Sequence, residues 1–503
     1  MANRSNPLET LHLEKDLAAR SANGVLIAMG GQAASTLLQI VNLVVLARLL
    51  DASDFGIYAL GMVLVGFAGI FSNLGLSSAS IQIKELTQNT ASGLFLINLA
   101  LGMAVMLVCF IGAPVFVWFL GEAQVFWAVV GLAAIVPVSA ASVQFEAVLA
   151  RGMRWREMQV VNLGSQSIGL LIGVLGALSG FTFMALVAAN GATALSRFLF
   201  AFLFSNWRPS RGVNWTECVP AIRFGLHQTG FTVCNFIHRQ ADVFLIGRIW
   251  GATEAGFYNR AYQLMAMPLN AVSGPLTQVF VPTLSRLQED PSRWARAFLR
   301  ATIASTLIGC AASILLVVNS VALVRLVLGG GWTGTADLFS WLSMSMIFTF
   351  PMGAASWAFI SRGRSKALFH WGLVSTALTV SAFFVAAPFG AVAVAKAYAL
   401  SVTLLTPICF SMALYGSQLK TSDAMLEIAP LWVASVATIF ALSNLSINSG
   451  SNVIDIAIRS SLALIMYALI VMPFAVLRSS YRQLGLQVLR HTSSIINKAL
   501  VRK

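Results

Sequence analysis

Long apolar stretches separated by short polar connections run along almost the whole chain. A helix of about 20 mostly apolar residues crosses the roughly 30 Å hydrocarbon layer of a bilayer. The sequence has fourteen such stretches, and we expect each to form one membrane span. They lie near 25–46, 55–76, 94–116, 124–147, 160–179, 182–204, 223–247, 262–283, 302–324, 338–360, 370–388, 391–415, 428–446 and 456–477. The pattern predicts an all-α integral membrane protein.

The positive charges are distributed unevenly between the two sides that this topology defines. Of the 32 Lys and Arg residues, 24 lie in termini or loops on the side of the N-terminus and four in loops on the other side. Cytoplasmic loops of membrane proteins are enriched in Lys and Arg. We therefore expect both termini to be cytoplasmic. The polar segment 1–23 does not have the apolar stretch of a secretory leader and is expected to be retained.

The chain also resembles itself at a shift of 200 residues. Arg, Ala, Gly and Tyr recur at corresponding places in LARLLDASDFGIY (46–58) and IGRIWGATEAGFY (246–258). A second match pairs ARGMR (150–154) with SRGRS (361–365). We expect two six-helix lobes related by an internal repeat. The predicted parts are a cytoplasmic arm (1–23), an N-lobe (24–204), a linker (205–222), a C-lobe (223–415), two additional helices (428–477) and a basic cytoplasmic tail (478–503).

Composition supports lipid rather than water as the surroundings of this chain. Apolar residues make up 58% of it and charged residues 10%, whereas about a quarter of the residues in soluble domains are charged. The net charge of +14 is explained by the loop bias, so no nucleic-acid partner is expected. No CxxC pair, phosphate-binding GxxxxGK[ST] loop or metal-ligand spacing is found in the sequence. We expect no cofactor, no metal and no catalytic residue, and therefore transport rather than enzymatic activity.

The seventh predicted span carries a polar stripe. Its members recur at steps of four and three, which places them on one helical face: Gln228, Thr232, Asn235, Arg239 and Asp242. An arginine at the centre of a membrane costs at least about 2.5–3.5 kcal/mol, so Arg239 should face a bundle interior or a watery cavity. The alternative is a structural ion pair between Arg239 and Asp242.

The first repeat has polar residues at the corresponding positions. Gln32, Gln39 and Asn42 correspond to Thr232, Arg239 and Asp242. Two polar stripes at a repeat interface are typical of the central cavity of a transporter. A guanidinium presents several donors to phosphate oxygens, so Arg239 is the first candidate for contact with an anionic group such as a diphosphate.

Other polar residues are weaker candidates for the same cavity. Arg48 and Arg248, at matching span ends near the outer side, are candidates for a release site, with interfacial snorkelling or loop capping as the alternative. Arg260, just beyond them, is a further cavity candidate. His238 is a candidate for titration, although lone histidines in polar helices usually have satisfied hydrogen bonds. Lys396 is an intramembrane cation that either contacts substrate or pairs locally.

Three prolines of the eighth span recur every seven residues, and each removes one backbone donor. They are candidates for a hinge, with static kinks as the alternative. Gly75 corresponds to the second of them in the first half. The prolines are Pro268, Pro275 and Pro282.

Five segments resemble a known family. They are LARLLDASDFGIYAL (46–60), FSNLGLSSASIQ (71–82), LARGMRW (149–155), RQADVFLIGRIWGATEAGFYNRAYQLMAMP (239–268) and VFVPTLSRLQED (279–290). On these segments the chain resembles the Wzx-type polysaccharide transporter family of the multidrug/oligosaccharidyl-lipid/polysaccharide (MOP) exporter superfamily, in its exopolysaccharide (succinoglycan- and colanic-acid-like) subgroup.

The resemblance implies a flippase in the bacterial inner membrane. Its substrate would be an undecaprenyl-diphosphate-linked oligosaccharide, and its lobes would enclose a cavity that opens alternately to each side. The implied partners are membrane lipids, a polysaccharide polymerase and a chain-length regulator. In relatives, cationic cavity residues meet the diphosphate, and here Arg239 and Arg48 lie within the matching segments.

Two other functions are compatible with a chain of this kind. A drug or cation antiporter of the same superfamily would need acidic cavity groups, and the predicted stripe has one acid, Asp242, beside an arginine. A membrane polysaccharide polymerase or ligase commonly carries a sizeable outer loop, whereas the predicted outer connections here are all under about twenty residues.

Overall fold

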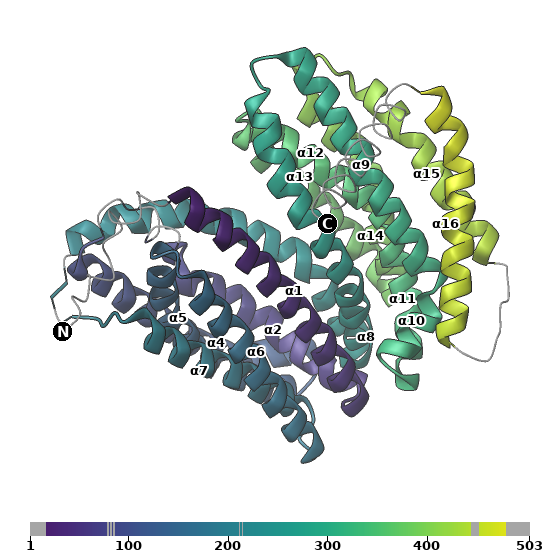
Figure 1. The fold of residues 1–503 in the computed structure, drawn as a ribbon. Coiled ribbons are helices and arrows are strands. Elements are labelled where there is room, and N and C mark those ends of the chain that lie inside the picture. The colour runs from purple at the N-terminus through teal and green to yellow at the C-terminus, as the bar shows by residue number, and fades with distance from the viewer. Residues whose placement is uncertain are drawn as a thin grey trace, which may run out of the picture. The chain divides into compact units, whose positions relative to one another are not determined.

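A computed structural model describes residues 17–77, 80, 83, 86–210, 212–213, 215–443 and 452–478 (Figure 1). Most of the predicted cytoplasmic arm and nearly all of the basic tail lie outside this range. Throughout the described part of the chain the regular structure is helical and no strand is present, which confirms the predicted all-α class.

The helices match the predicted spans closely in most of the chain. Their bounds are α1 (Leu17–Leu49), α2 (Ala52–Asn73), α4 (Gln88–Leu120), α5 (Val125–Arg151), α6 (Trp155–Leu178), α7 (Phe183–Ser205), α8 (Trp215–Arg286), α9 (Pro291–Val318), α10 (Ser320–Val327), α11 (Thr333–Met344), α12 (Met346–Ser361), α13 (Ser365–Ala386), α14 (Ala391–Leu414), α15 (Thr421–Ser443) and α16 (Asn452–Leu477). Short 3₁₀ turns lie at Gly330–Trp332 and Ala387–Phe389.

Large apolar side chains remain exposed along the helices. On α4, for example, Ile111, Val115 and Trp118 are 78%, 66% and 83% exposed. Such exposure would be costly in water but is favourable in lipid, where the helix satisfies its own backbone hydrogen bonds. The chain is therefore a multi-pass membrane protein.

The number of spans depends on how two irregular regions are counted. Twelve helices of the described residues are long and apolar enough to cross a membrane, or thirteen if α11 and α12 are taken as one span. These two helices were expected as one span at 338–360, and they meet at a bend of 42° near Ser345. Counting α8 twice would give fourteen, a number that stays a prediction.

The long helix α8 reverses direction at Gly251. This residue has φ 84° and ψ 177°, which is outside the helical region and is accessible mainly to glycine. The hydroxyl of Tyr258 lies 2.8 Å from a carboxylate oxygen of Asp242, sixteen residues earlier. Sixteen residues of straight helix span about 24 Å, which is farther than these two side chains reach. The helix therefore consists of a first arm, 215–250, and a second arm, 252–286. The start of the second arm, up to Asn259, folds back along the first arm.

This reversal corrects one expectation from the sequence. Residues 248–261 were expected to form an outer connection, but the second arm of α8 is helical from 252 onward. Arg260 thus lies inside a helix. Pro268, Pro275 and Pro282 also lie in the second arm, where the helical backbone continues through them. Gly75, with φ 66°, follows the left-handed C-cap of α2 and lies where that helix ends.

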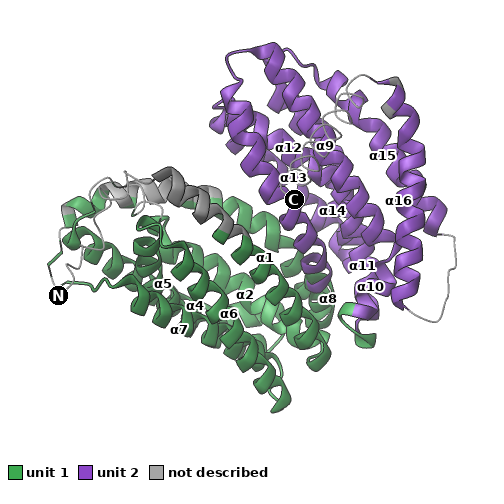
Figure 2. Cartoon of the chain, viewed as in Figure 1, with its two compact units in different colours: residues 1–259, 327–331 green, residues 260–326, 332–503 purple. Residues whose placement is uncertain are grey.

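The chain divides into two compact units (Figure 2). Unit 1 contains Met1–Asn259 and Val327–Gly331, and unit 2 contains Arg260–Leu326 and Trp332–Lys503. The division falls inside α8, not in the predicted linker at 205–222. The first arm of α8 packs along α2 in unit 1, where a Cβ at Gly247 would overlap Leu60 and one at Gly66 would meet Phe236. The predicted lobes, as units that move during transport, stay a prediction.

Each unit has its own aromatic core. In unit 1, Phe145 packs against Phe95, Phe198, Phe202 and Trp207. Trp207 belongs to the predicted linker, yet it is buried, and its indole donates to Gln88 over 2.8 Å. In unit 2, Trp294 and Phe298 of α9 belong to a core that includes Phe359 of α12 and Phe410 of α14. The core of unit 2 fixes the first turns of α9, which also carry Arg293, Arg296 and Arg300.

Candidate functional site

Two helical hairpins of unit 1 cross at a pair of glycines. A Cβ at Gly56 of α2 would overlap the carbonyl oxygen of Ala252, and a Cβ at Gly256 of α8 would overlap the carbonyl oxygen of Ala52. The two contacts are reciprocal at a shift of 200 residues, as in an interface between two-fold related surfaces. Small residues allow helix backbones to approach this closely in membranes. The segments that resemble each other in sequence therefore contact each other in the fold.

The polar stripe of α8 divides into an exposed part and a buried part. Arg239 is exposed, as are Thr232 and Asn235, whereas Asp242 is 2% exposed. Three residues along a helix turn through 300°, which leaves Arg239 and Asp242 about 60° apart on the helix surface. This angle is enough for one side chain to face the second arm and the other to face outward. The side chain of Gln228 lies outside the described residues.

Asp242 is held inside the α8 hairpin. One carboxylate oxygen accepts a hydrogen bond from the Tyr258 hydroxyl at 2.8 Å and the other lies 2.8 Å from the backbone nitrogen of Val243. Tyr258 is fully buried. The ion pair between Arg239 and Asp242, considered as a structural alternative, is absent from the described residues. Asp242 therefore braces the hairpin, and the positive charge of Arg239 is not neutralised by it.

A further candidate on the same arm of α8 is His238, one turn before Asp242. It is half-buried, and its Nδ1 atom has no hydrogen-bond partner within the part of the chain that the structure describes. At this nitrogen, the described residues do not supply the hydrogen bond expected of a structural histidine.

The polar stripe of α1 is partly engaged with α6. Ser35 is buried and exchanges hydrogen bonds with Gln166 at 3.0–3.1 Å, and Gln39 donates to Ser35 at 3.3 Å. Gln32 and Gln39 are exposed, and Asn42 is half-buried. The amide of Gln39 is thus oriented by its neighbours while its side chain stays accessible.

The cations near the reversals of the two hairpins are exposed. Arg248 lies over the ring of Phe119, 5.2 Å from its centroid, in a cation–π arrangement. Arg48 is exposed at the end of α1, near Gly329. Glu122 accepts a hydrogen bond of 3.4 Å from the backbone nitrogen of Ala252, so a carboxylate caps the second arm of α8 directly after Gly251.

The two cationic candidates of unit 2 have local contacts. Arg260 is buried and donates to Gln263 on the same helix. Lys396 is exposed on α14, with its Nζ atom 5.1 Å from the centroid of the Trp341 ring. The side chains of Arg260 and Lys396 thus already contact other groups of the protein. Arg239 is therefore the stronger candidate for contact with substrate.

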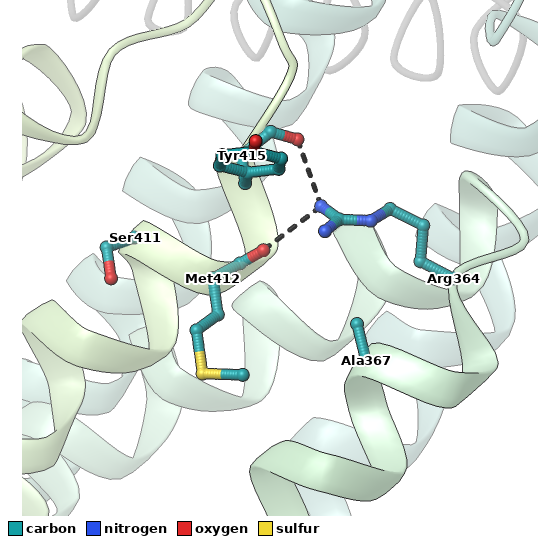
Figure 3. Close-up of a pocket in the computed structure, with 5 residues that line it drawn as sticks. All are labelled: Arg364, Ala367, Ser411, Met412 and Tyr415. Carbon is teal, nitrogen blue, oxygen red and sulfur yellow. Dashed lines mark hydrogen bonds between the residues drawn. The ribbon is translucent and has the colours of Figure 1, made fainter.

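A small cavity lies at the end of α14 in unit 2 (Figure 3). It is lined by Arg364, Ala367, Ser411, Met412 and Tyr415 and has a volume of about 330 Å³. Arg364 donates to the backbone carbonyls of Met412 and Tyr415 at 3.0 Å. Because this guanidinium caps the C-terminal carbonyls of α14, its role is structural.

The same arrangement occurs in unit 1 and includes a contact that the sequence did not reveal. Arg154, from the loop that resembles the Arg364 loop, donates to the carbonyl of Phe204 at the end of α7. Nearby, Arg197 pairs with Glu146 at 2.8 Å and donates to Asn162 over the same distance. Arg197 is therefore a locally paired intramembrane cation. No group of three or more His, Cys, Asp or Glu residues that could hold a metal is found among the described residues.

Several residues of this region were missed by sequence reasoning, although a signal existed for most of them. Gly56, Gly256 and Tyr258 all belong to the repeated segment, so the repeat itself marked them. Glu122 is far from its partner in sequence and no local pattern indicated the contact.

The fold defines the class of protein. The structure matches lipid II flippase MurJ in an inward closed conformation with a TM-score of 0.70, at 13% identity, over 90% of this chain and 99% of that one. This likeness shows that the two chains share the same helical fold.

The sequence then shows the family. The profile of the family described as "Polysaccharide biosynthesis protein" matches residues 45–337, more than half of the chain, and the chain belongs to this family. It is 24% identical over 378 residues to the succinoglycan biosynthesis transport protein ExoT of Rhizobium meliloti (strain 1021), which covers 75% of this chain and 76% of ExoT. It is 25% identical over 299 residues to the lipopolysaccharide biosynthesis protein WzxC of Escherichia coli (strain K12), covering 59% and 60%. The resemblance inferred from the sequence is confirmed.

Proposed function

We propose that this chain is a flippase that moves undecaprenyl-diphosphate-linked oligosaccharide repeat units from the cytoplasmic to the outer leaflet of the bacterial inner membrane. It would serve exopolysaccharide or lipopolysaccharide synthesis and work by alternating access, without covalent chemistry. Family membership supports the pathway. The names of ExoT, a transport protein of succinoglycan biosynthesis, and of MurJ, a lipid II flippase, support the kind of activity.

The observation that carries the proposal is the separation of Arg239 from Asp242. Arg239 lies twelve residues before Gly251, or about 18 Å along the helix, which is near the middle of a hydrocarbon layer of about 30 Å. The neighbouring acid is occupied by Tyr258, and Arg239 has no ion pair among the described residues, so its charge lies on an exposed polar surface with Thr232 and Asn235. A guanidinium so placed suits the diphosphate that joins the lipid to the oligosaccharide.

The same observation argues against a cation antiporter. Binding of cations or of cationic drugs needs an accessible carboxylate, and the acid of this stripe is enclosed in the hairpin. We further propose that both termini are cytoplasmic and that the product is handed to a polysaccharide polymerase working with a chain-length regulator. Arg48, Arg248, Gln32, Gln39 and Asn42 are proposed secondary contacts along the route.

The test is to replace Arg239 in a host whose own copy of the gene is deleted. We expect Arg239→Ala to abolish secretion of the polysaccharide and to cause lipid-linked oligosaccharide to accumulate facing the cytoplasm. Arg239→Lys should restore part of the secretion, because a point charge replaces the forked donor. Arg156→Ala, which removes an exposed arginine at the start of α6, serves as the control and should secrete normally.

Three outcomes would contradict the proposal. Normal secretion by Arg239→Ala, with equal amounts of protein in the membrane, would remove the site assignment. Deletion that leaves secretion unchanged but causes drug sensitivity would indicate an antiporter. Oligosaccharide that accumulates on the outer face would indicate a polymerase or ligase.

A further inference from the structure

The first turns of α9 carry a basic stripe. Arg293, Arg296 and Arg300 are spaced by three and four residues, so they lie on one helical face. The Cβ atoms of neighbouring members are about 5–6 Å apart. Arg293 and Arg296 are exposed and Arg300 is half-buried. We refer to these three residues as the α9 stripe.

The stripe lies directly before a segment of membrane length. Residues 301–318 contain no charged side chain, and these eighteen residues of helix span about 27 Å, close to the thickness of the hydrocarbon layer. The helix as a whole has 28 residues, so its first turns extend beyond that layer. The three guanidiniums are therefore expected at the level of the lipid phosphates.

The opposite face of the same turns is anchored. Trp294 and Phe298 are buried with their rings stacked 5.2 Å apart, and the Trp294 indole donates to Ser361 at 3.2 Å. Asp290 caps the helix by accepting from the backbone nitrogen of Arg293 at 3.0 Å. This bond and one from the Ser292 hydroxyl hold the pKa of Asp290 below its usual range. The stripe is thus presented by a helix end that is already fixed in place.

The stripe differs from the other basic groups at the helix ends. Arg154 and Arg364 donate hydrogen bonds to backbone carbonyls at the ends of α7 and α14, so both guanidiniums are engaged in capping these helices. Arg296 has no hydrogen bond or ion pair within the described residues, and Arg293 has a single contact of 4.0 Å with Asp290, in which both side chains are largely exposed. Such an exposed pair contributes little, so the charges of Arg293 and Arg296 remain available.

We propose that the α9 stripe binds the headgroups of anionic phospholipids in the adjacent leaflet, which is the cytoplasmic leaflet in the proposed orientation. Phosphodiesters match the guanidinium fork, and basic residues next to a membrane span attract anionic lipids. A lipid with two phosphates can engage two neighbouring arginines at once. Cardiolipin is therefore expected to bind more tightly than phosphatidylglycerol, and both more tightly than phosphatidylethanolamine.

The experiment measures binding of these three lipids to the purified full-length protein in an uncharged detergent, which needs no transport activity. The variant R293Q/R296Q/R300Q is compared with R156Q/K366Q/K420Q, which removes the same charge from three exposed positions scattered over three other segments. We expect the stripe variant to bind cardiolipin about tenfold more weakly or worse and the control to bind as the wild type does. Binding by the wild type should weaken at high salt.

The outcomes separate lipid binding from its alternatives. Equal binding of cardiolipin and phosphatidylethanolamine, or equal losses in the two triple variants, would overturn the proposal. A stripe variant that keeps cardiolipin but loses undecaprenyl diphosphate would also overturn it and would assign the stripe to substrate loading. Because Arg239 is intact in both variants, failure of this proposal leaves the proposed function untouched.

Discussion

The two hairpins of unit 1 share a contact geometry but differ in how their polar groups are used. Both reverse at repeat-related positions, near Asp51 and at Gly251, and they cross at Gly56 and Gly256. In the first hairpin, the polar groups bind a neighbouring helix: Asn190 of α7 donates to the Tyr58 hydroxyl at 2.9 Å. In the second, the corresponding Tyr258 binds Asp242 within its own hairpin.

This difference indicates a division of tasks. The α1–α2 hairpin is attached to the body of unit 1 by α7, where Asp54 also accepts from the backbone nitrogen of Phe183 at 3.0 Å. The α8 hairpin has an internal brace in addition to its contacts with α2 and Glu122. The glycine crossing is the feature that both retain, and the polar contacts are the feature in which the two repeats have diverged.

The largest effect is expected where the two hairpins touch. Gly56→Ala and Gly256→Ala each place a methyl group against a backbone carbonyl, and the helices must move apart. Overpacking of this kind typically costs about 1–3 kcal/mol. Both variants should show a clearly lower unfolding temperature in detergent.

Each helix provides its own control for this prediction. Gly69 of α2 and Gly274 of α8 have no atom within 4 Å of an added Cβ. Alanine at these sites should be neutral or slightly stabilising, because it lowers the entropy of the unfolded chain. If Gly56→Ala were as stable as Gly69→Ala, the crossing would not be the close contact described.

An intermediate effect is expected from the two tyrosines, and it sharpens the contrast between the hairpins. Tyr258→Phe leaves the buried carboxylate of Asp242 without its hydroxyl donor, and an unsatisfied buried polar group costs about 1–3 kcal/mol. Tyr58→Phe should cost less, because Tyr58 and Asn190 are only half-buried and the lost bond leaves no buried carboxylate without its donor. Thermal unfolding of both variants side by side measures the difference, and equal losses would refute the proposed division.

The sequence predicted the helices well and the side-chain environment poorly, for a physical reason. Apolar length decides whether a segment spans a membrane, so α4 to α7 and α13 to α16 lie close to the predicted spans. Helical periodicity predicted that Arg239 and Asp242 lie on one face of the helix. Whether each side chain is buried, however, depends on which segment packs against it. The partner of Asp242 comes from beyond the Gly251 reversal, which hydropathy does not reveal.

The roles of the arginines show the same limit. Arg154, Arg364 and Arg293 all lie in loops or turns counted by sequence as positive charges on one side. In the structure, the first two cap helix ends and the third lies on an exposed helix face. These roles depend on which carbonyls lie nearby, and that is set by contacts between segments roughly 50 residues apart in the chain.

The smallest effect is expected from the repeat-related acids Asp54 and Glu254. Asp54 accepts from the backbone nitrogens of Phe183 at 3.0 Å and of Asp51 at 3.2 Å, so it satisfies donors at the start of both α7 and α2. Glu254 has no hydrogen bond among the described residues. Asp54→Ala should therefore cost about 1 kcal/mol, as the loss of a helix cap does, and Glu254→Ala almost nothing. Unfolding temperatures of the two variants test this, and a larger loss for Glu254→Ala would mean that Glu254 stabilises the start of the second arm of α8 more than Asp54 stabilises α2 and α7.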